Sequence, residues 1–186
     1  MSELEVKALR ATLEAAAIIA KTKARQGPVR DQCVIELALG TGLRVSEISQ
    51  LKIGDIDLKR GGHSLIVRHG KGDKQRVVKF SSTLKNLILE YIEYRDKDSE
   101  YLFPSERQEY MSSNALQKVF KKWAMKAGLP ARYSIHSCRH YYATALLKVS
   151  RNLRLTQVQL GHSNPQTTTV YAQVLDEELD EAVEKL

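Results

Sequence analysis

Apolar residues recur every three to four positions over most of the chain, which is the period of an amphipathic α-helix. Residues 3–24 have this spacing and predict a first helix, which Gly27-Pro28 is expected to end. The same spacing predicts helices over residues 29–40, 45–51, 81–94, 112–127, 136–148, 154–160 and 165–174. Serines are suited to cap three of them at the N-terminus: Ser81, Ser112 or Ser113, and Ser134.

The pattern changes between Lys52 and Phe80, where short apolar runs predict β-strands. The runs cover residues 53–58, 63–69 and 75–80, and a Gly-Lys-Gly-Asp turn at 70–73 is typical of a β-hairpin. The sequence therefore predicts a mainly α fold with a small three-stranded antiparallel β-sheet, an α+β architecture.

The bulk properties are those of one globular domain. The chain has 186 residues, of which 42% are hydrophobic and 27% charged. No apolar run approaches 18 residues, so no membrane span is predicted. The two cysteines, Cys33 and Cys138, are too few for a disulfide framework, and we expect a reducing cytoplasm.

The charge favours a polyanionic partner. The net charge is +7, although residues 176–186 hold six acids and one lysine, which leaves +12 on the remainder. A basic body with an acidic tail suits a protein that binds nucleic acid, since phosphates attract clustered lysine and arginine.

Two arginines are candidates for binding a phosphodiester. Arg44 lies in TGLRVSE, beside glycines that allow a sharp turn, and Arg139 lies in HSCRHYYAT. A planar guanidinium can donate two hydrogen bonds to the non-bridging oxygens of a phosphate. His136 precedes Arg139 by three positions, so both side chains share one face of the predicted helix.

A histidine and a tyrosine follow in LGHSNPQTTTVY. His162 stands before Asn164-Pro165, which predicts a helix start, and Tyr171 lies nine positions after His162. The β-branched residues between them are poor helix formers, so this segment suits a mobile arm that carries the tyrosine. Tyr141 and Tyr142 follow the helix period and are expected to pack in the core.

The predicted hairpin is basic. Lys71 is at its tip, between two glycines, and Arg68, Lys74 and Arg76 surround it. We expect these three flanking side chains to contact DNA phosphates.

Together these motifs, TGLRVSE, GKGDKQR, HSCRHYYAT and LGHSNPQTTTVY, resemble the tyrosine recombinase (phage integrase) family, most closely Xer-type and integrase catalytic domains. The resemblance implies the tyrosine recombinase catalytic-domain fold and a site-specific recombinase or integrase that breaks and rejoins DNA. It implies that Tyr171 attacks the scissile phosphate to give a 3′-phosphotyrosyl link. Arg44 and Arg139 match the two arginines that bind this phosphate.

The resemblance also implies the supporting roles. Lys71 matches the lysine that protonates the leaving 5′-oxygen, and His136 the histidine that assists proton transfer from the tyrosine. His162 matches a histidine that hydrogen-bonds the phosphate, and Glu47 an acidic residue that braces the site. No cofactor or metal is expected, because the covalent link conserves the energy of the broken bond.

The expected domain organisation is a catalytic domain over residues 1–175, with the motif match starting at about residue 29. An acidic amphipathic tail follows at 176–186. From the resemblance we expect that these 186 residues do not include the N-terminal core-binding domain usual in the family. The resemblance implies that the partner is double-stranded DNA, located in the nucleoid. It also implies that a homo-oligomer binds this DNA, as a tetramer on paired sites. The oligomeric state without DNA stays open.

Three alternatives use the same residues. A metal site could use His136 and His140 with Cys138 and His162, although Cys138 is expected to point away from the histidines. A type IB topoisomerase would relax DNA with the same groups. A non-catalytic DNA-binding factor could have kept the fold.

Overall fold

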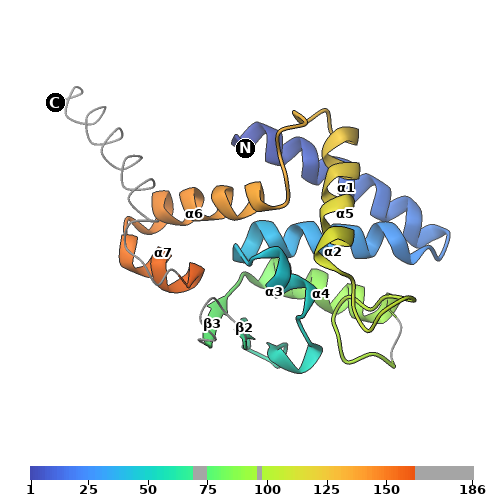
Figure 1. The fold of residues 1–186 in the computed structure, drawn as a ribbon, viewed down its shortest axis with the longest axis horizontal. Helices are drawn as coiled ribbons and strands as arrows, with labels where there is room; N and C mark the ends of the chain where they lie inside the picture. The colour runs from blue at the N-terminus through green and yellow to red at the C-terminus, as the bar shows by residue number, and fades with distance from the viewer. Residues whose placement is uncertain (69–74, 96–97, 162–186) are drawn as a thin grey trace.

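The computed structural model describes residues 1–68, 75–95 and 98–161 (Figure 1). The elements in chain order are α1 (Glu3–Thr22), α2 (Gln26–Thr41), α3 (Val45–Ser49), the 3-10 turn η1 (Ile53–Asp55), β1 (Ile56–Asp57), β2 (Ser64–Val67), β3 (Arg76–Lys79), α4 (Ser82–Tyr94), α5 (Ser113–Lys126), α6 (His136–Ser150) and α7 (Leu153–Leu160). This mainly helical fold with one small sheet confirms the predicted class.

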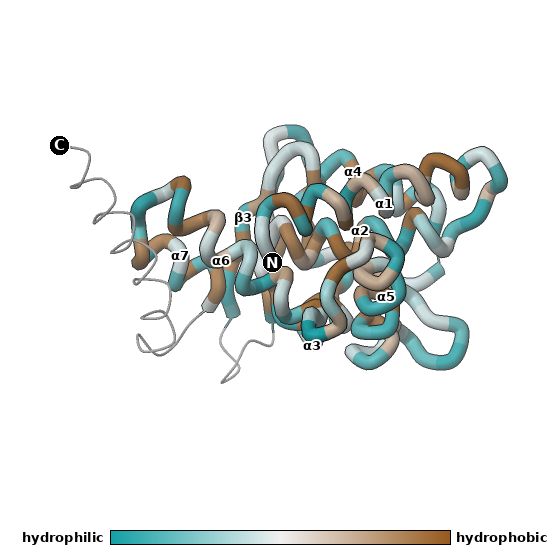
Figure 2. The backbone as a smooth tube through the Cα atoms, turned by 90° about the horizontal axis from the view of Figure 1, so that it is seen from above, coloured by the Kyte–Doolittle hydropathy of each residue, from teal (hydrophilic) through white to brown (hydrophobic). Residues whose placement is uncertain are grey.

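Helix α2 lies at the centre of the main core. It packs against α1, α4, α5 and α6, and it buries side chains on more than one face because it has neighbours on several sides (Figure 1). Hydrophobic and hydrophilic stretches alternate along the surrounding helices, as the colouring of Figure 2 shows. In α1 the buried positions follow the helical period, from Val6 through Leu9 and Leu13 to Ala17.

Two of the predicted helix caps are confirmed and one is wrong. Ser81 and Ser112 accept hydrogen bonds at the starts of α4 and α5. Ser134 does not cap α6 with its side chain: its N–H donates to Ser137 Oγ at 3.1 Å, and Ile135 occupies the N-cap. Gly27-Pro28 does not separate two helices but lies in the first turn of α2, where the missing N–H of a proline costs no hydrogen bond.

The sheet has the order β1-β2-β3 and both pairings are antiparallel. Leu65 pairs with Ile56 on one side and with Val78 on the other, and all three side chains are buried against the helices. The first predicted strand is shorter than expected, because residues 53–55 form η1 before β1 begins.

Helices α6 and α7 extend from the main body (Figure 1). A second apolar cluster, built on Ala143, Leu147 and Leu160, holds the two helices together. The other end of α6 is anchored in the main core by Cys138, which is fully buried. Across the described residues no helix combines the length and the apolar character needed to cross a membrane.

Candidate active site

Arg44 is held in place by the turn between α2 and α3. Helix α2 ends at Gly42 in the left-handed conformation (φ 64°), and Arg44 is then the extended N-cap residue of α3. A Cβ at position 42 would lie 2.5 Å from the Tyr142 ring and 2.8 Å from Leu160. Glycine is therefore required at position 42 both by the backbone conformation and by the close approach of α6 and α7. The contact of Gly42 with these two helices fixes the position of the turn that carries Arg44.

Glu47 accepts four hydrogen bonds in the interior of the site. Its Oε1 accepts from Arg44 Nη1 at 2.9 Å and from Arg76 Nη1 at 2.8 Å. Its Oε2 accepts from the Arg44 backbone N–H and from Arg76 Nη2, both at 2.8 Å. Only 3% of the Glu47 side chain is exposed.

These contacts keep Glu47 ionised. Burial alone would raise the pKa of this carboxyl, but the hydrogen bonds from Arg76 and Arg44 outweigh burial and hold the pKa below its ordinary value. A carboxylate with both oxygens occupied by donors is a poor proton acceptor. The geometry therefore suits the bracing role that the resemblance implies.

Arg139 joins the ends of two helices. It is 5% exposed, and its Nη1 donates to the Gly42 carbonyl at 2.6 Å while Nη2 donates to the Leu160 carbonyl at 2.7 Å. Since Gly42 is two residues before Arg44, this contact brings the two predicted phosphate-binding arginines to one region. They come from positions 95 residues apart in the chain.

His136 is the first residue of α6, next to these arginines. Partial burial lowers its pKa, and the nearby charges of His140, Arg139 and Arg44 lower it further. Its ring meets the ring of His140 edge-on, with centroids 4.8 Å apart. A lowered pKa keeps this imidazole neutral at pH 7, the form that can accept a proton.

The charge of the cluster favours an anion. Arg44, Arg76 and Arg139 contribute three positive charges against the single negative charge of Glu47, which leaves +2 on these four side chains. A site with this surplus and with guanidinium donors is chemically suited to a phosphate group.

The remaining predicted site residues lie outside the described residues: Lys71, Lys74, His162 and Tyr171. The predicted helix 165–174 and the tail 176–186 lie there as well. In the sequence, Lys71 stands between β2 and β3, and His162 directly follows Gly161, the C-cap of α7.

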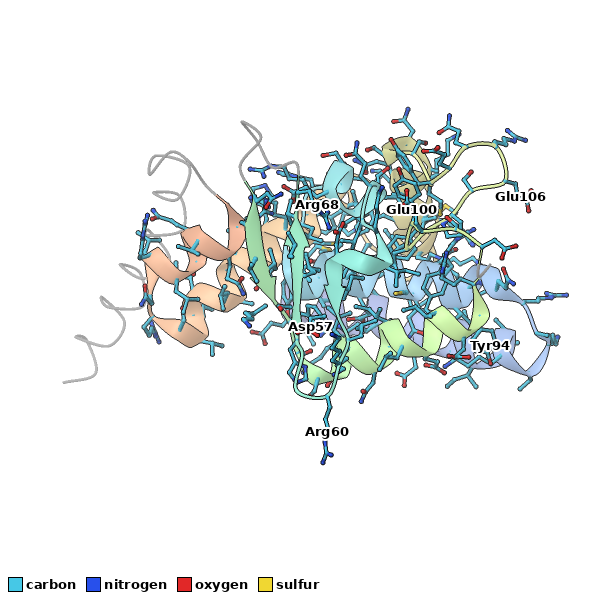
Figure 3. The ribbon with its side chains drawn as sticks, turned by 90° about the horizontal axis from the view of Figure 1, so that it is seen from below. Asp57, Arg60, Arg68, Tyr94, Glu100 and Glu106 are labelled. Atoms are coloured by element: carbon cyan, nitrogen blue, oxygen red, sulfur yellow. The ribbon has the colours of Figure 1, made fainter. Side chains whose placement is uncertain are left out.

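The two described basic residues of the hairpin differ from each other. Arg68, at the end of β2, has a side chain that is 53% exposed and donates from Nε to Asp55 at 2.5 Å (Figure 3). Arg76 is instead only 10% exposed and pairs with Glu47. We expected Arg76 to lie on the DNA-facing surface together with Arg68. The burial of the Arg76 side chain does not agree with that expectation.

The sequence contained a signal for the burial of Arg76 in the alternation of side chains along the predicted strand 75–80. Side chains two positions apart on a strand share one face. Arg76 precedes the fully buried Val78 by two positions and pairs with the buried Val67. Arg76 therefore faces inward, although its charge suggested a surface position.

The metal-site alternative loses one of its ligands. Cys138 is fully buried in the main core, and burial raises its pKa well above the ordinary value. Among the residues that the structure describes, no group of three possible ligand side chains comes together. His136 and His140 remain adjacent to each other on α6.

Comparison with solved structures identifies the class of this fold. The crystal structure of XerA recombinase superimposes with a TM-score of 0.78 at 27% identity, covering 100% of this chain and 62% of that one. A post-cleavage complex of the XerH site-specific recombinase with palindromic difH substrate gives a TM-score of 0.81 at 26% identity, covering 98% and 52%. The fold is that of a tyrosine recombinase catalytic domain.

The sequence comparisons give the family. The phage integrase family matches residues 8–178, and the chain belongs to this family. Tyrosine recombinase XerA of Pyrococcus furiosus is 38% identical over 160 residues, or 84% of this chain and 54% of the relative. XerA of Thermococcus onnurineus is 42% identical over 159 residues, or 84% and 55%. The chain thus spans about half the length of these curated relatives.

Proposed function

We propose that this chain is the catalytic domain of a site-specific DNA recombinase that cleaves and rejoins DNA through a tyrosine. The observation that carries the proposal is the convergence of Arg44, Arg139 and His136. These residues come from two sequence motifs that are far apart in the chain, and they meet in a cluster with surplus positive charge. Family membership and the Xer relatives support the same reaction.

In the proposed reaction, the Tyr171 oxygen forms a bond to the scissile phosphorus and the bond from phosphorus to the 5′-oxygen breaks. A proton from Lys71 goes to the leaving oxygen, and His136 assists removal of the tyrosine proton. Arg44 and Arg139 donate to the non-bridging oxygens, where charge develops, and His162 adds a further hydrogen bond. A 5′-hydroxyl then attacks the phosphotyrosine, which releases the tyrosine and restores the phosphodiester.

A covalent-adduct assay tests this function. Wild-type protein incubated with nicked duplexes that carry inverted-repeat candidate sites is expected to form a protein–DNA adduct that survives denaturation. The Tyr171→Phe variant lacks the nucleophilic oxygen and is expected to form none. Tyr94→Phe, on α4, serves as the matched control and is expected to retain the adduct (Figure 3).

An adduct that persists in Tyr171→Phe would exclude Tyr171 as the nucleophile. If the wild type formed no adduct on any candidate site, the result would count against an enzymatic function and favour a non-catalytic DNA-binding factor. Relaxation of supercoiled plasmid without any exchange of strands would instead favour a topoisomerase.

The proposed substrate is double-stranded DNA, and exchange of strands requires several protomers on paired sites. A tetramer joining two duplexes is the assembly we propose, with the acidic tail at 176–186 as a candidate contact between protomers. Light scattering of the protein with and without site DNA measures this assembly. A complex that stays at one protomer per duplex under recombining conditions would contradict it.

Arg68 is expected to contribute to binding through a DNA phosphate. Because it is half exposed, Arg68→Ala should flatten the dependence of log affinity on log salt by about 0.9 for the lost contact. Arg60, which projects from the β1–β2 loop at the other end of the sheet, is the matched control, and Arg60→Ala should leave the slope unchanged (Figure 3). Fluorescence anisotropy over a salt series measures both, and equal slopes for Arg68→Ala and wild type would remove Arg68 from the interface.

A further inference from the structure

Arg76 occupies an unusual position for a residue of a basic hairpin. It is the first residue of β3, and its side chain is directed to the same face as the buried Val78. With 90% of its side chain covered, the charge of Arg76 is compensated inside the protein rather than by solvent. Its contacts are therefore part of the internal structure of the site.

The guanidinium of Arg76 bridges two elements. Nη1 and Nη2 donate to the two oxygens of Glu47, each at 2.8 Å, which is the paired geometry that favours arginine over lysine. Nε donates to the Gln159 carbonyl in the last turn of α7 at 3.3 Å. One side chain on β3 thereby holds both α3 and α7.

The turn after α7 is fitted closely to Arg76. Gly161 has a positive φ of 65°, and a Cβ there would lie 2.6 Å from Arg76 Cδ and 2.8 Å from Nε. The side-chain amide of Gln159 also exchanges hydrogen bonds with the backbone N–H and C=O of Lys79, at 3.0 and 3.2 Å. The end of α7 is therefore fixed on β3 immediately before the chain continues to His162.

Two consecutive carbonyls at this end of α7 accept from two different arginines. The Gln159 carbonyl accepts from Arg76 and the Leu160 carbonyl accepts from Arg139. Through Glu47, Arg76 also shares a carboxylate with Arg44. Arg76 is thus connected to both arginines that bind the phosphate in the proposed function: to Arg44 through the Glu47 carboxylate, and to Arg139 through the consecutive Gln159 and Leu160 carbonyls.

We propose that Arg76 is a positioning residue, which sets the geometry of Arg44 through Glu47 and that of Arg139 through the end of α7, and does not itself bind DNA. This inference rests on the proposed function. Arg76 donates a hydrogen bond to each Glu47 oxygen. In the described part of the chain, the Arg44 side chain donates to Glu47 through Nη1. Without Arg76, the buried carboxylate would draw the whole Arg44 guanidinium toward itself and away from the phosphate.

The test compares two substrates with Arg76→Gln, Arg76→Lys and the wild type. One is the ordinary nicked duplex, and the other carries a methylphosphonate at the scissile position, where a methyl group replaces one charged oxygen. A neutral phosphonate needs less compensation of charge from Arg44 and Arg139. Arg10→Gln, which breaks a surface pair with Glu36, is the matched control.

For Arg76→Gln we expect DNA affinity close to that of the wild type and single-turnover cleavage slower by about 10²-fold on the phosphodiester, the size of effect that a small displacement of catalytic groups produces. On the methylphosphonate the difference between variant and wild type should shrink by at least about tenfold. Arg76→Lys should recover little, because one ammonium cannot reach both Glu47 oxygens and the Gln159 carbonyl. Arg10→Gln should match the wild type on both substrates.

Three results would overturn the inference. Equal slowing of Arg76→Gln on both substrates would indicate a general loss of structure, and unchanged cleavage would indicate no role. A loss of affinity with an unchanged rate at saturation would make Arg76 a DNA contact. Failure of the proposed function has a different signature, the absence of adduct with the wild type, and this would remove the inference as well.

Discussion

Replacing Arg139 with alanine is expected to slow DNA cleavage by about 10²–10³-fold while changing DNA affinity far less. The physical reason is that its guanidinium is already fixed by the Gly42 and Leu160 carbonyls, so it requires no rearrangement when charge develops on the phosphate. Single-turnover formation of the adduct, at saturating protein and constant salt, measures the effect. Arg139→Lys should recover little, since an ammonium cannot reach both carbonyls and the phosphate.

The control for Arg139 is Arg132→Ala, which removes an exposed arginine stacked on Tyr133. This variant should cleave as the wild type does. Because Arg139 also ties α2 to α7, the melting temperature of each variant has to be compared. Cleavage by a folded Arg139→Ala protein at nearly the wild-type rate would exclude Arg139 from the site.

Glu47→Ala is expected to reduce the free energy of unfolding by about 3 kcal/mol at neutral pH, the size seen when one partner of a buried ion pair is removed. The change deletes the common acceptor of Arg44 and Arg76 and leaves the largely buried Arg76 guanidinium without its carboxylate. Urea denaturation followed by circular dichroism measures it. Glu36→Ala, which removes the acid of a surface pair with Arg10, should cost less than about 1 kcal/mol.

The pH dependence gives an independent check on Glu47. Its pKa in the folded protein is lowered, so the unfolded chain binds the proton more readily than the folded one. The stabilisation is fully present above the ordinary carboxyl pKa of about 4.5 and is lost as the pH falls through the lowered value. The stability difference between wild type and Glu47→Gln should therefore shrink below about pH 4.5. A constant difference down to pH 3 would show that the Glu47 charge does not stabilise the fold.

The sequence by itself determined which segments of the described chain are helical and which residues are candidates for the chemistry. Helical periodicity and local caps such as Ser81 and Ser112 depend on neighbours within a few positions, so they are readable from the chain. The motifs around Arg44 and Arg139 indicated the family, which the sequence and structural comparisons confirmed. The resemblance also assigned Glu47 a bracing role, and its four hydrogen bonds fit that role.

Only the tertiary structure decided which partners these residues have. Arg76 donates hydrogen bonds to residues 29 and 83 positions away, and Arg139 donates one to a carbonyl 97 positions away. Local sequence patterns cannot predict contacts over such separations. Charge suggested that Arg76 faces DNA, but the strand alternation and the buried carboxylate of Glu47 turned it inward. A buried charge is stable only where a partner is supplied, and the packing of α3, β3 and α7 supplies it here.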